Sequence, residues 1–237
     1  MQFQHSEQIW ADFPELAAGV LATTSITTSD EAAERVVGRV KRLYALADEL
    51  LAGGTEADLP QIRAWRAAFT RMGLRPTQYR CAAESLLRRY RKEGTLPAVH
   101  PLVEMCNAIS LGYAIPVAVL DTEQVTGPLT VRYADGSERY SSFGGETEHP
   151  HPGEVIFADQ AGNVHARRWC HRQSARSAVS ATTTSVLIVA EAMHESARGD
   201  VQRLLATAAA ELSVIWPGTQ QVAQLSRDHP RFETGQP

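Results

Sequence analysis

The sequence predicts an α+β fold: one domain with a mixed or antiparallel sheet, hairpins and packed helices. Helix-type patterns dominate residues 29–111, strand-type runs dominate 116–191, and one more amphipathic segment follows at 197–212. Strands and helices do not alternate singly along the chain, so we do not expect the parallel sheet of an α/β protein.

The first 55 residues contain one expected strand and one expected helix. Residues 16–24 form a short apolar and β-branched run, which is typical of a strand. Ser29 provides an N-cap for a helix whose apolar residues recur at helical spacing until Gly53. We interpret 1–55 as an appendage packed on a domain at 56–232, followed by a frayed tail at 233–237.

Further helices are expected at 59–72, 77–93 and 102–111, and strands at 116–120 and 185–191. Asp135-Gly136 predicts a hairpin that joins strands at 129–133 and 139–142. Gly162-Asn163 predicts a second hairpin, between strands at 153–158 and 164–169.

Composition places the chain among ordinary globular proteins. Of 237 residues, 43% are hydrophobic and 21% charged, which excludes disordered, collagen-like and coiled-coil chains. Apolar runs such as 186–190 fall far short of the roughly 20 residues of a membrane helix. The N-terminus shows no secretory signal, and the three cysteines lack CxxC pairing. We therefore expect a reduced cytoplasmic protein without a disulfide, metal or cofactor and without a membrane partner.

The charge distribution is uneven although the net charge is only −4. Residues 63–92 carry nine basic side chains and one acidic one, whereas 93–165 carry ten acidic and two basic side chains. A segregated basic face favours RNA as a partner. The alternative is a helix face that is merely solvated.

Common catalytic signatures are missing from the sequence: there is no phosphate-binding glycine loop, GxSxG or HExxH. His149 and His151 offer a metal-ligand pair, although the prolines beside them favour a turn. Cys170 beside His171 offers a thiol nucleophile, but adjacent residues on a strand face opposite ways. Residues 167–174 and 182–185 combine arginines, Trp169 and hydroxyls, which suits either a pocket rim for phosphate and base or a solvated strand end.

Residues 96–121, LPAVHPLVEMCNAISLGYAIPVAVLD, resemble the B3/B4 editing domain of the bacterial phenylalanyl-tRNA synthetase β subunit. Residues 153–159 and 168–173 are even more similar to free-standing relatives of that domain. The resemblance spans about 63–192, and it implies a trans-editing hydrolase that removes a wrongly attached amino acid from aminoacyl-tRNA. The alternatives are a non-catalytic tRNA-binding module and an aminoacyl-tRNA-dependent acyl transferase.

The resemblance also suggests site residues. The expected catalytic group lines the amino-acid pocket and positions water; its members are Asn107, His100, Thr183 and Gln173. Substrate-binding positions are Gly144, Gly145, Trp169, His171 and Thr184. The expected tRNA-binding cations are Arg80, Arg88, Arg89, Lys92, Arg168 and Arg172. Two departures remove polar contacts, because Ala118 stands where synthetases have histidine and no carboxylate lies at 173–175. In the synthetases that this region resembles, the domain removes tyrosine wrongly attached to the phenylalanine tRNA; with these polar contacts missing, tyrosine specificity is not expected here.

Overall fold

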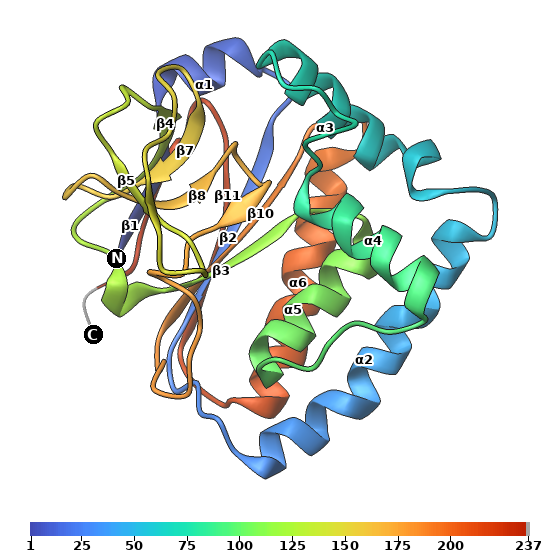
Figure 1. The fold of residues 1–237 in the computed structure, drawn as a ribbon. Helices are drawn as coiled ribbons and strands as arrows, with labels where there is room; N and C mark the ends of the chain where they lie inside the picture. Colours follow the sequence, from blue (N-terminus) through green and yellow to red (C-terminus); the bar gives the residue numbers. More distant parts are fainter. Residues whose placement is uncertain (236–237) are drawn as a thin grey trace.

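The central layer is a four-stranded antiparallel sheet in the computed structural model, which describes residues 1–235. Its order is β11 (Gln220–Leu225), β2 (Ala17–Thr23), β10 (Val186–Ala192) and β3 (Val117–Asp121). Every residue of β10 is buried, as are six of the seven in β2. These two strands are buried because helices cover one face of the sheet and a second sheet lies on the other side (Figure 1).

The second sheet has eight strands and mixed direction. Its path is β12 (Arg231–Glu233), β1 (Gln2–His5), β4 (Leu129–Tyr133), β7 (Val155–Ala158), β8 (Asn163–Arg167), β5 (Arg139–Ser141) and β6 (Thr147–Glu148). The short β9 (Arg172–Gln173) pairs with β8. The β1–β4 and β5–β8 pairs are parallel and the others antiparallel. The predicted α+β class is confirmed.

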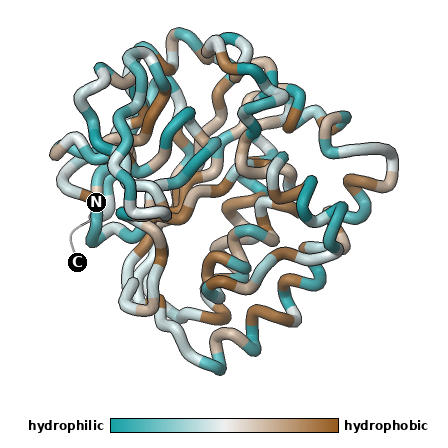
Figure 2. The backbone as a smooth tube through the Cα atoms, viewed as in Figure 1, coloured by the Kyte–Doolittle hydropathy of each residue, from teal (hydrophilic) through white to brown (hydrophobic). Residues whose placement is uncertain are grey.

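Helices α2 (Asp30–Leu51), α4 (Ala82–Glu93), α5 (Pro101–Tyr113) and α6 (Ala197–Ile215) lie together beside the central sheet (Figure 1). The remaining helices are α1 (Glu7–Asp12), α3 (Pro60–Arg71), η1 (Glu56–Asp58) and η2 (Thr122–Gln124). Apolar segments concentrate in the central strands and the helix faces beside them (Figure 2). Burial of this apolar surface is the main force that holds the layers together.

The helix boundaries follow local capping. Ser29 caps α2, as predicted, because its hydroxyl accepts the backbone N–H of Ala32 at 3.1 Å. Helix α4 begins at Ala82, five residues later than expected, because Cys81 is its N-cap and the chain before it forms a separate turn at Arg75. Gly94 ends α4 in the left-handed region at φ 70°.

The hairpin predicted at Asp135-Gly136 is wrong. Strand β4 pairs with β1 and β7, while β5 pairs with β8 and β6. The buried carboxylate of Glu138 accepts the backbone N–H groups of Asp135 and Gly136 at 3.2 and 3.0 Å and binds Arg132. These bonds close the turn around the side chain of Glu138, and the strand that follows the turn, β5, pairs with β8 instead of β4. The second predicted hairpin, β7–β8, is confirmed.

The first 55 residues contribute internal strands to both sheets. Strand β2 lies between β11 and β10, and β1 lies between β12 and β4. If residues 1–55 only packed on the outside of the domain, both sheets would lack these internal strands. The domain boundary at residue 55 stays a prediction. In the expected tail, Glu233 pairs with Gln2, while residues 236–237 lie outside the described residues.

Candidate functional site

His100 is the N-cap of α5. Its Nδ1 accepts the backbone N–H of Leu102 at 3.2 Å, which places the proton of the neutral ring on Nε2. Nε2 then donates to the hydroxyl of Thr28 at 2.8 Å. Burial lowers the pKa of His100 and so favours this neutral form. Both ring nitrogens are used within the fold, and neither is free for a substrate.

Asn107 lies two turns further along α5 and is half-buried. Glu104 precedes it by three residues, so the two side chains share a helix face. Neither has a side-chain hydrogen bond to any other residue in 1–235. Burial raises the pKa of the Glu104 carboxyl, which makes its carboxylate a stronger base than that of an exposed glutamate. Glu104 is a further candidate that the sequence analysis did not name; its spacing of three residues from Asn107 was the available signal.

Gln173, Thr183 and Thr184 are brought together along β3 and the turn after it. Nε2 of Gln173 donates to a backbone oxygen of β3 at 2.6 Å. The hydroxyl of Thr183 donates to Asp121 at 2.7 Å, and that of Thr184 donates to Glu123 at 3.1 Å. These bonds anchor segment 172–185 to β3. The amide oxygen of Gln173 keeps no partner among residues 1–235.

Trp169 is fully enclosed. Its indole N–H donates to Glu191 at 3.0 Å, and its ring lies edge-on to those of Trp65 and Phe13. With 0% of its surface exposed, it offers no face to a base, so the aromatic platform expected at this residue is absent. Its positive φ of 57° marks the tight turn between β8 and β9.

His171 contacts the segment before α4, while the two glycines lie elsewhere. Nδ1 of His171 bonds the backbone oxygen of Arg80 at 2.7 Å, and burial lowers the pKa of this imidazole. Gly144 and Gly145 are exposed in the loop between β5 and β6. Backbone bonding of Ser141 to the chain just after Gln173 holds that loop beside segment 172–185.

Two buried glutamates organise the cations around α4. Glu84, 0% exposed, accepts hydrogen bonds from Arg66 at 2.6 and 3.1 Å and lies 3.3 Å from Nε of Arg80. Glu56, 1% exposed, binds Arg88 at 3.3 Å and Arg91 at 3.0 Å. The hydrogen bond to Glu84 raises the pKa of Arg66. Each carboxylate thus holds two guanidinium groups in place.

These cations form what we call the α4 basic face: Arg66, Arg80, Arg88, Arg91 and Lys92. The side chains of Arg88 and Arg91 remain 47% exposed, and with Lys92 they line a cavity of about 270 Å³. Five cations against two carboxylates leave the face positive. Arg89 lies outside it and pairs with Glu93 at 2.9 Å.

The second group of arginines, which we call the β8 cluster, comprises Arg167, Arg168 and Arg172. Arg167, with 3% of its side chain exposed, donates to Glu154 at 2.8 and 2.9 Å and to Glu148 at 2.5 Å. Burial would raise the pKa of Glu154, but Arg167 and Arg168 outweigh it and lower the pKa. The side chain of Arg168, 15% exposed, lies 4.7 Å from the Tyr79 ring centre. Only Arg172 stays substantially exposed, at 42%.

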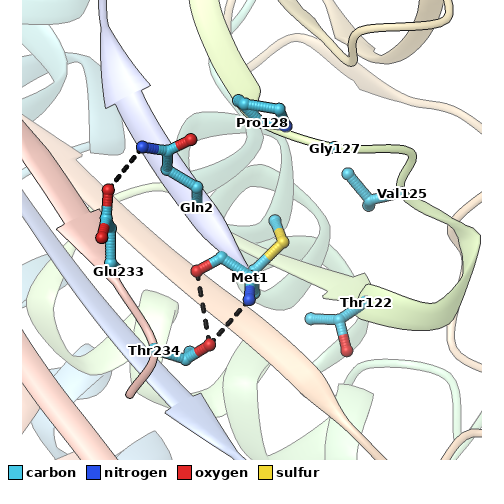
Figure 3. Close-up of a pocket in the computed structure, with 8 residues that line it drawn as sticks. All are labelled: Met1, Gln2, Thr122, Val125, Gly127, Pro128, Glu233 and Thr234. Atoms are coloured by element: carbon cyan, nitrogen blue, oxygen red, sulfur yellow. Dashed lines mark hydrogen bonds between the residues drawn. The ribbon is translucent and has the colours of Figure 1, made fainter. Parts of the chain in front are cut away.

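Two sizeable cavities lie away from the expected site residues. Two neighbouring cavities, of about 540 and 480 Å³, share Met1, Thr122 and Thr234 and contain none of the predicted catalytic residues. Figure 3 shows the first, where Gln2 bonds Glu233 at 2.6 Å and the amino group of Met1 bonds Thr234 at 2.7 Å.

Metal and thiol chemistry find no support in the part of the chain that the structure describes. No group of three or more His, Cys, Asp or Glu side chains in residues 1–235 could hold a metal ion. His149 bonds the backbone oxygen of Glu138 through Nδ1 at 2.8 Å. Burial raises the pKa of Cys170 well above its usual value, which disfavours a thiolate. Within residues 1–235, no helix is long and apolar enough to cross a membrane.

The comparisons with known proteins identify the family. The family model for the B3/4 domain matches residues 64–211, more than half of the chain. The chain belongs to the B3/4 domain family. This match runs from α3 to α6, so it includes α4, Asn107 and segment 172–185. It leaves β1, β2, β11 and β12 outside.

A phenylalanine–tRNA ligase β subunit from Cereibacter sphaeroides is 32% identical over 73 residues, 31% of this chain. That stretch is 9% of the ligase subunit, so this B3/4 domain chain corresponds to a small part of its relative. A solved N-terminal fragment of the phenylalanyl-tRNA synthetase β subunit from Pyrococcus horikoshii is 11% identical, with a TM-score of 0.47. The alignment covers 92% of this chain and 49% of that one.

Proposed function

We propose that this B3/4 domain protein hydrolyses, in trans, the ester between a wrongly attached amino acid and the 3′ end of a tRNA. The observation that carries the proposal is the α4 basic face, which lies beside the helix that bears Asn107 and Glu104 (Figure 1). The similarity to a phenylalanine–tRNA ligase subunit supports tRNA as the partner. The cytoplasmic location stays a prediction.

The α4 basic face would bind phosphates of the tRNA acceptor end. A guanidinium that a buried carboxylate holds at one edge keeps its other N–H groups in a fixed direction. Arg88 and Arg91 have this arrangement through Glu56, and Lys92 adds a mobile charge beside them. In the β8 cluster, Arg172 is the exposed member that would extend the contact surface.

The reaction requires a positioned water and acceptance of one proton. The water oxygen bonds the ester carbonyl carbon, the bond from that carbon to the ribose oxygen breaks, and the ribose leaves as an alcohol. The unpaired amide of Asn107 would hold the water or the substrate carbonyl. Glu104, on the same helix face, would take the proton from the water and return it to the ribose oxygen. The free amide oxygen of Gln173 would bind the amino group of the substrate.

The chemistry of the site favours a small or apolar amino acid. Ala118 replaces the histidine of the synthetases, and the side chains of Thr183 and His100 are occupied by bonds within the fold. Fewer polar groups therefore remain to recognise a phenolic hydroxyl. In this account His100 and Thr183 position α5 and segment 172–185.

A non-catalytic tRNA-binding module is the second candidate. It is favoured by the same internal bonds, because two of the four expected catalytic side chains are engaged. In that case the α4 basic face would act alone, and changes at Asn107 would have no consequence.

A deacylation screen separates the two candidates. The protein is incubated with individually mischarged tRNAs, and survival of the 3′ ester is followed for wild type, Asn107→Ala and Glu104→Gln. Tyr113→Phe, at the other end of α5, is the matched control. We expect rapid loss of one amino acid, slowed at least about 100-fold in Glu104→Gln and unchanged in Tyr113→Phe. Binding without loss of any ester would contradict hydrolysis and favour the binding module.

A further inference from the structure

A cavity of about 460 Å³ lies between β1, α1 and the chain that joins β11 to β12. Its lining includes His5 and Trp10 on one side and Arg227 and Arg231 on the other. None of the residues expected to act on tRNA lines it, and its lining lies outside the 64–211 family match.

Two buried nitrogens in this lining lack partners among the described residues: Nε1 of Trp10 and Nδ1 of His5. Trp10 is 3% exposed, and the His5 side chain is 0% exposed. The Nε2 of His5 lies 2.6 Å from Glu191, so the carboxylate fixes the ring and leaves Nδ1 as the free position. A buried donor without a partner is destabilising, and an anion that accepts from the indole N–H of Trp10 removes this cost, whereas Nδ1 of His5 is an acceptor when Nε2–H faces Glu191.

The mouth of the cavity is positive. Arg227 and Arg231 are exposed and form no ion pair within residues 1–235, in contrast to most arginines of this chain. Glu7 is the acidic residue of the lining, so two cations face one carboxylate. A neighbouring cavity beyond Trp10 shares Arg227 and adds Arg198, but three carboxylates also line it, so its charge favours an anion less.

We propose that the first cavity binds a small phosphate-bearing anion, either inorganic phosphate or the phosphate group of a small molecule. The planar guanidinium groups of Arg227 and Arg231 bind its oxygens in pairs, and the indole N–H of Trp10 donates to it from inside. A recessed cavity with an acidic residue at its rim does not suit a continuous nucleic-acid backbone. This site is separate from the tRNA function proposed above.

Isothermal titration calorimetry in low-salt chloride buffer tests the proposal, with inorganic phosphate, pyrophosphate and a short single-stranded oligoribonucleotide as probes. We expect saturable binding of phosphate or pyrophosphate at one site per chain. Arg227→Gln and Arg231→Gln each weaken it at least about fivefold. Arg139→Gln, an exposed arginine on β5 without an ion pair in residues 1–235, is the matched control and leaves binding unchanged.

Trp10→Phe keeps the ring and removes the donor, so we expect weaker binding with the fold retained in circular dichroism. If that variant does not fold, the two exposed arginines still decide the question. No saturation at millimolar phosphate, or equal losses in Arg139→Gln, would overturn the proposal. Tighter binding of the oligoribonucleotide through the same two arginines would also overturn it, in favour of a nucleic-acid contact.

Discussion

The α4 basic face and the β8 cluster use the same ion-pair chemistry with opposite results. Around α4, one buried carboxylate holds two arginines by one edge, and Arg88 and Arg91 stay 47% exposed. In the β8 cluster, two carboxylates enclose the single guanidinium of Arg167, which is 3% exposed. The number of arginines therefore does not locate a phosphate-binding surface. Such a surface is indicated by the ratio of carboxylates to guanidinium groups and by how far the guanidinium groups are exposed.

Arg167→Ala should cause the largest loss in the free energy of unfolding. Removal of this side chain leaves the carboxylates of Glu154 and Glu148 without their main partner, and only 6% of the Glu154 side chain is exposed. A buried ion pair broken on one side costs about 3–5 kcal/mol of unfolding free energy. Urea denaturation of Arg167→Ala and Arg91→Ala measures the difference. Equal, small losses in both variants would remove the distinction between the two regions.

A smaller loss is expected for Glu56→Gln. The neutral amide fills the same buried space but loses charge-assisted hydrogen bonds to Arg88 and Arg91. Such bonds contribute about 1.5–3 kcal/mol each at most, and exposure of both arginines reduces the total to about 1–3 kcal/mol. Chemical denaturation measures the stability. No loss would show that Glu56 does not fix these side chains.

The acid sensitivity of the helical layer should depend on His100. Burial lowers its folded pKa below the unfolded value, so the unfolded state takes up a proton first as the pH falls. This contribution to stability is complete above the unfolded pKa, near 6.5, and is lost below it. His100→Asn keeps an N-cap without titrating, so its stability should fall less between neutral pH and pH 5, by at most about 1.4 kcal/mol per pH unit.

Thermal or urea unfolding across this pH range tests the prediction through slopes rather than absolute stabilities. Burial also lowers the pKa of His165 and His171, so the variant should retain part of the acid sensitivity. Identical slopes for wild type and His100→Asn would contradict a buried neutral imidazole at the start of α5.

Arg89→Ala should change the free energy of unfolding least. Its ion pair with Glu93 is exposed on both sides, at 50% and 42%, and exposed pairs contribute at most about 0.5 kcal/mol. The variant should match wild type in denaturation. A loss as large as that of Arg167→Ala would mean that exposure does not separate these arginines.

Local patterns were sufficient for much of the fold. Ser29 and the periodic residues after it predicted α2, and the apolar runs predicted β2 and β10. The Asp135-Gly136 hairpin failed because a buried contact from Glu138 overrides the turn preference. The pairing of β1 with β12 joins residues more than 200 positions apart and has no local signature.

The site was predictable only in part. The charge pattern predicted Arg88 and Lys92, which line one cavity of the α4 basic face. The resemblance suggested Asn107, whose side chain has no hydrogen-bond partner in residues 1–235. Trp169 was expected to offer an aromatic face to a base, but the rings of Trp65 and Phe13 enclose it. These contacts join distant parts of the sequence, so local patterns could not predict them. Glu56 lies far from α4 in the sequence, so its ion pairs with Arg88 and Arg91 could not be predicted from local patterns.

The central claim is that the α4 basic face binds tRNA and that Arg167 and Arg168, the two largely enclosed arginines of the β8 cluster, do not. The direct test measures the tRNA dissociation constant against salt for wild type, for Arg88→Gln/Arg91→Gln/Lys92→Gln, and for Arg168→Gln as the control. We predict that the triple variant lowers the slope of log K against log salt by about two to three and weakens binding at least about tenfold. Arg168→Gln should leave both unchanged. An unchanged slope in the triple variant, with a loss in Arg168→Gln, would contradict the account.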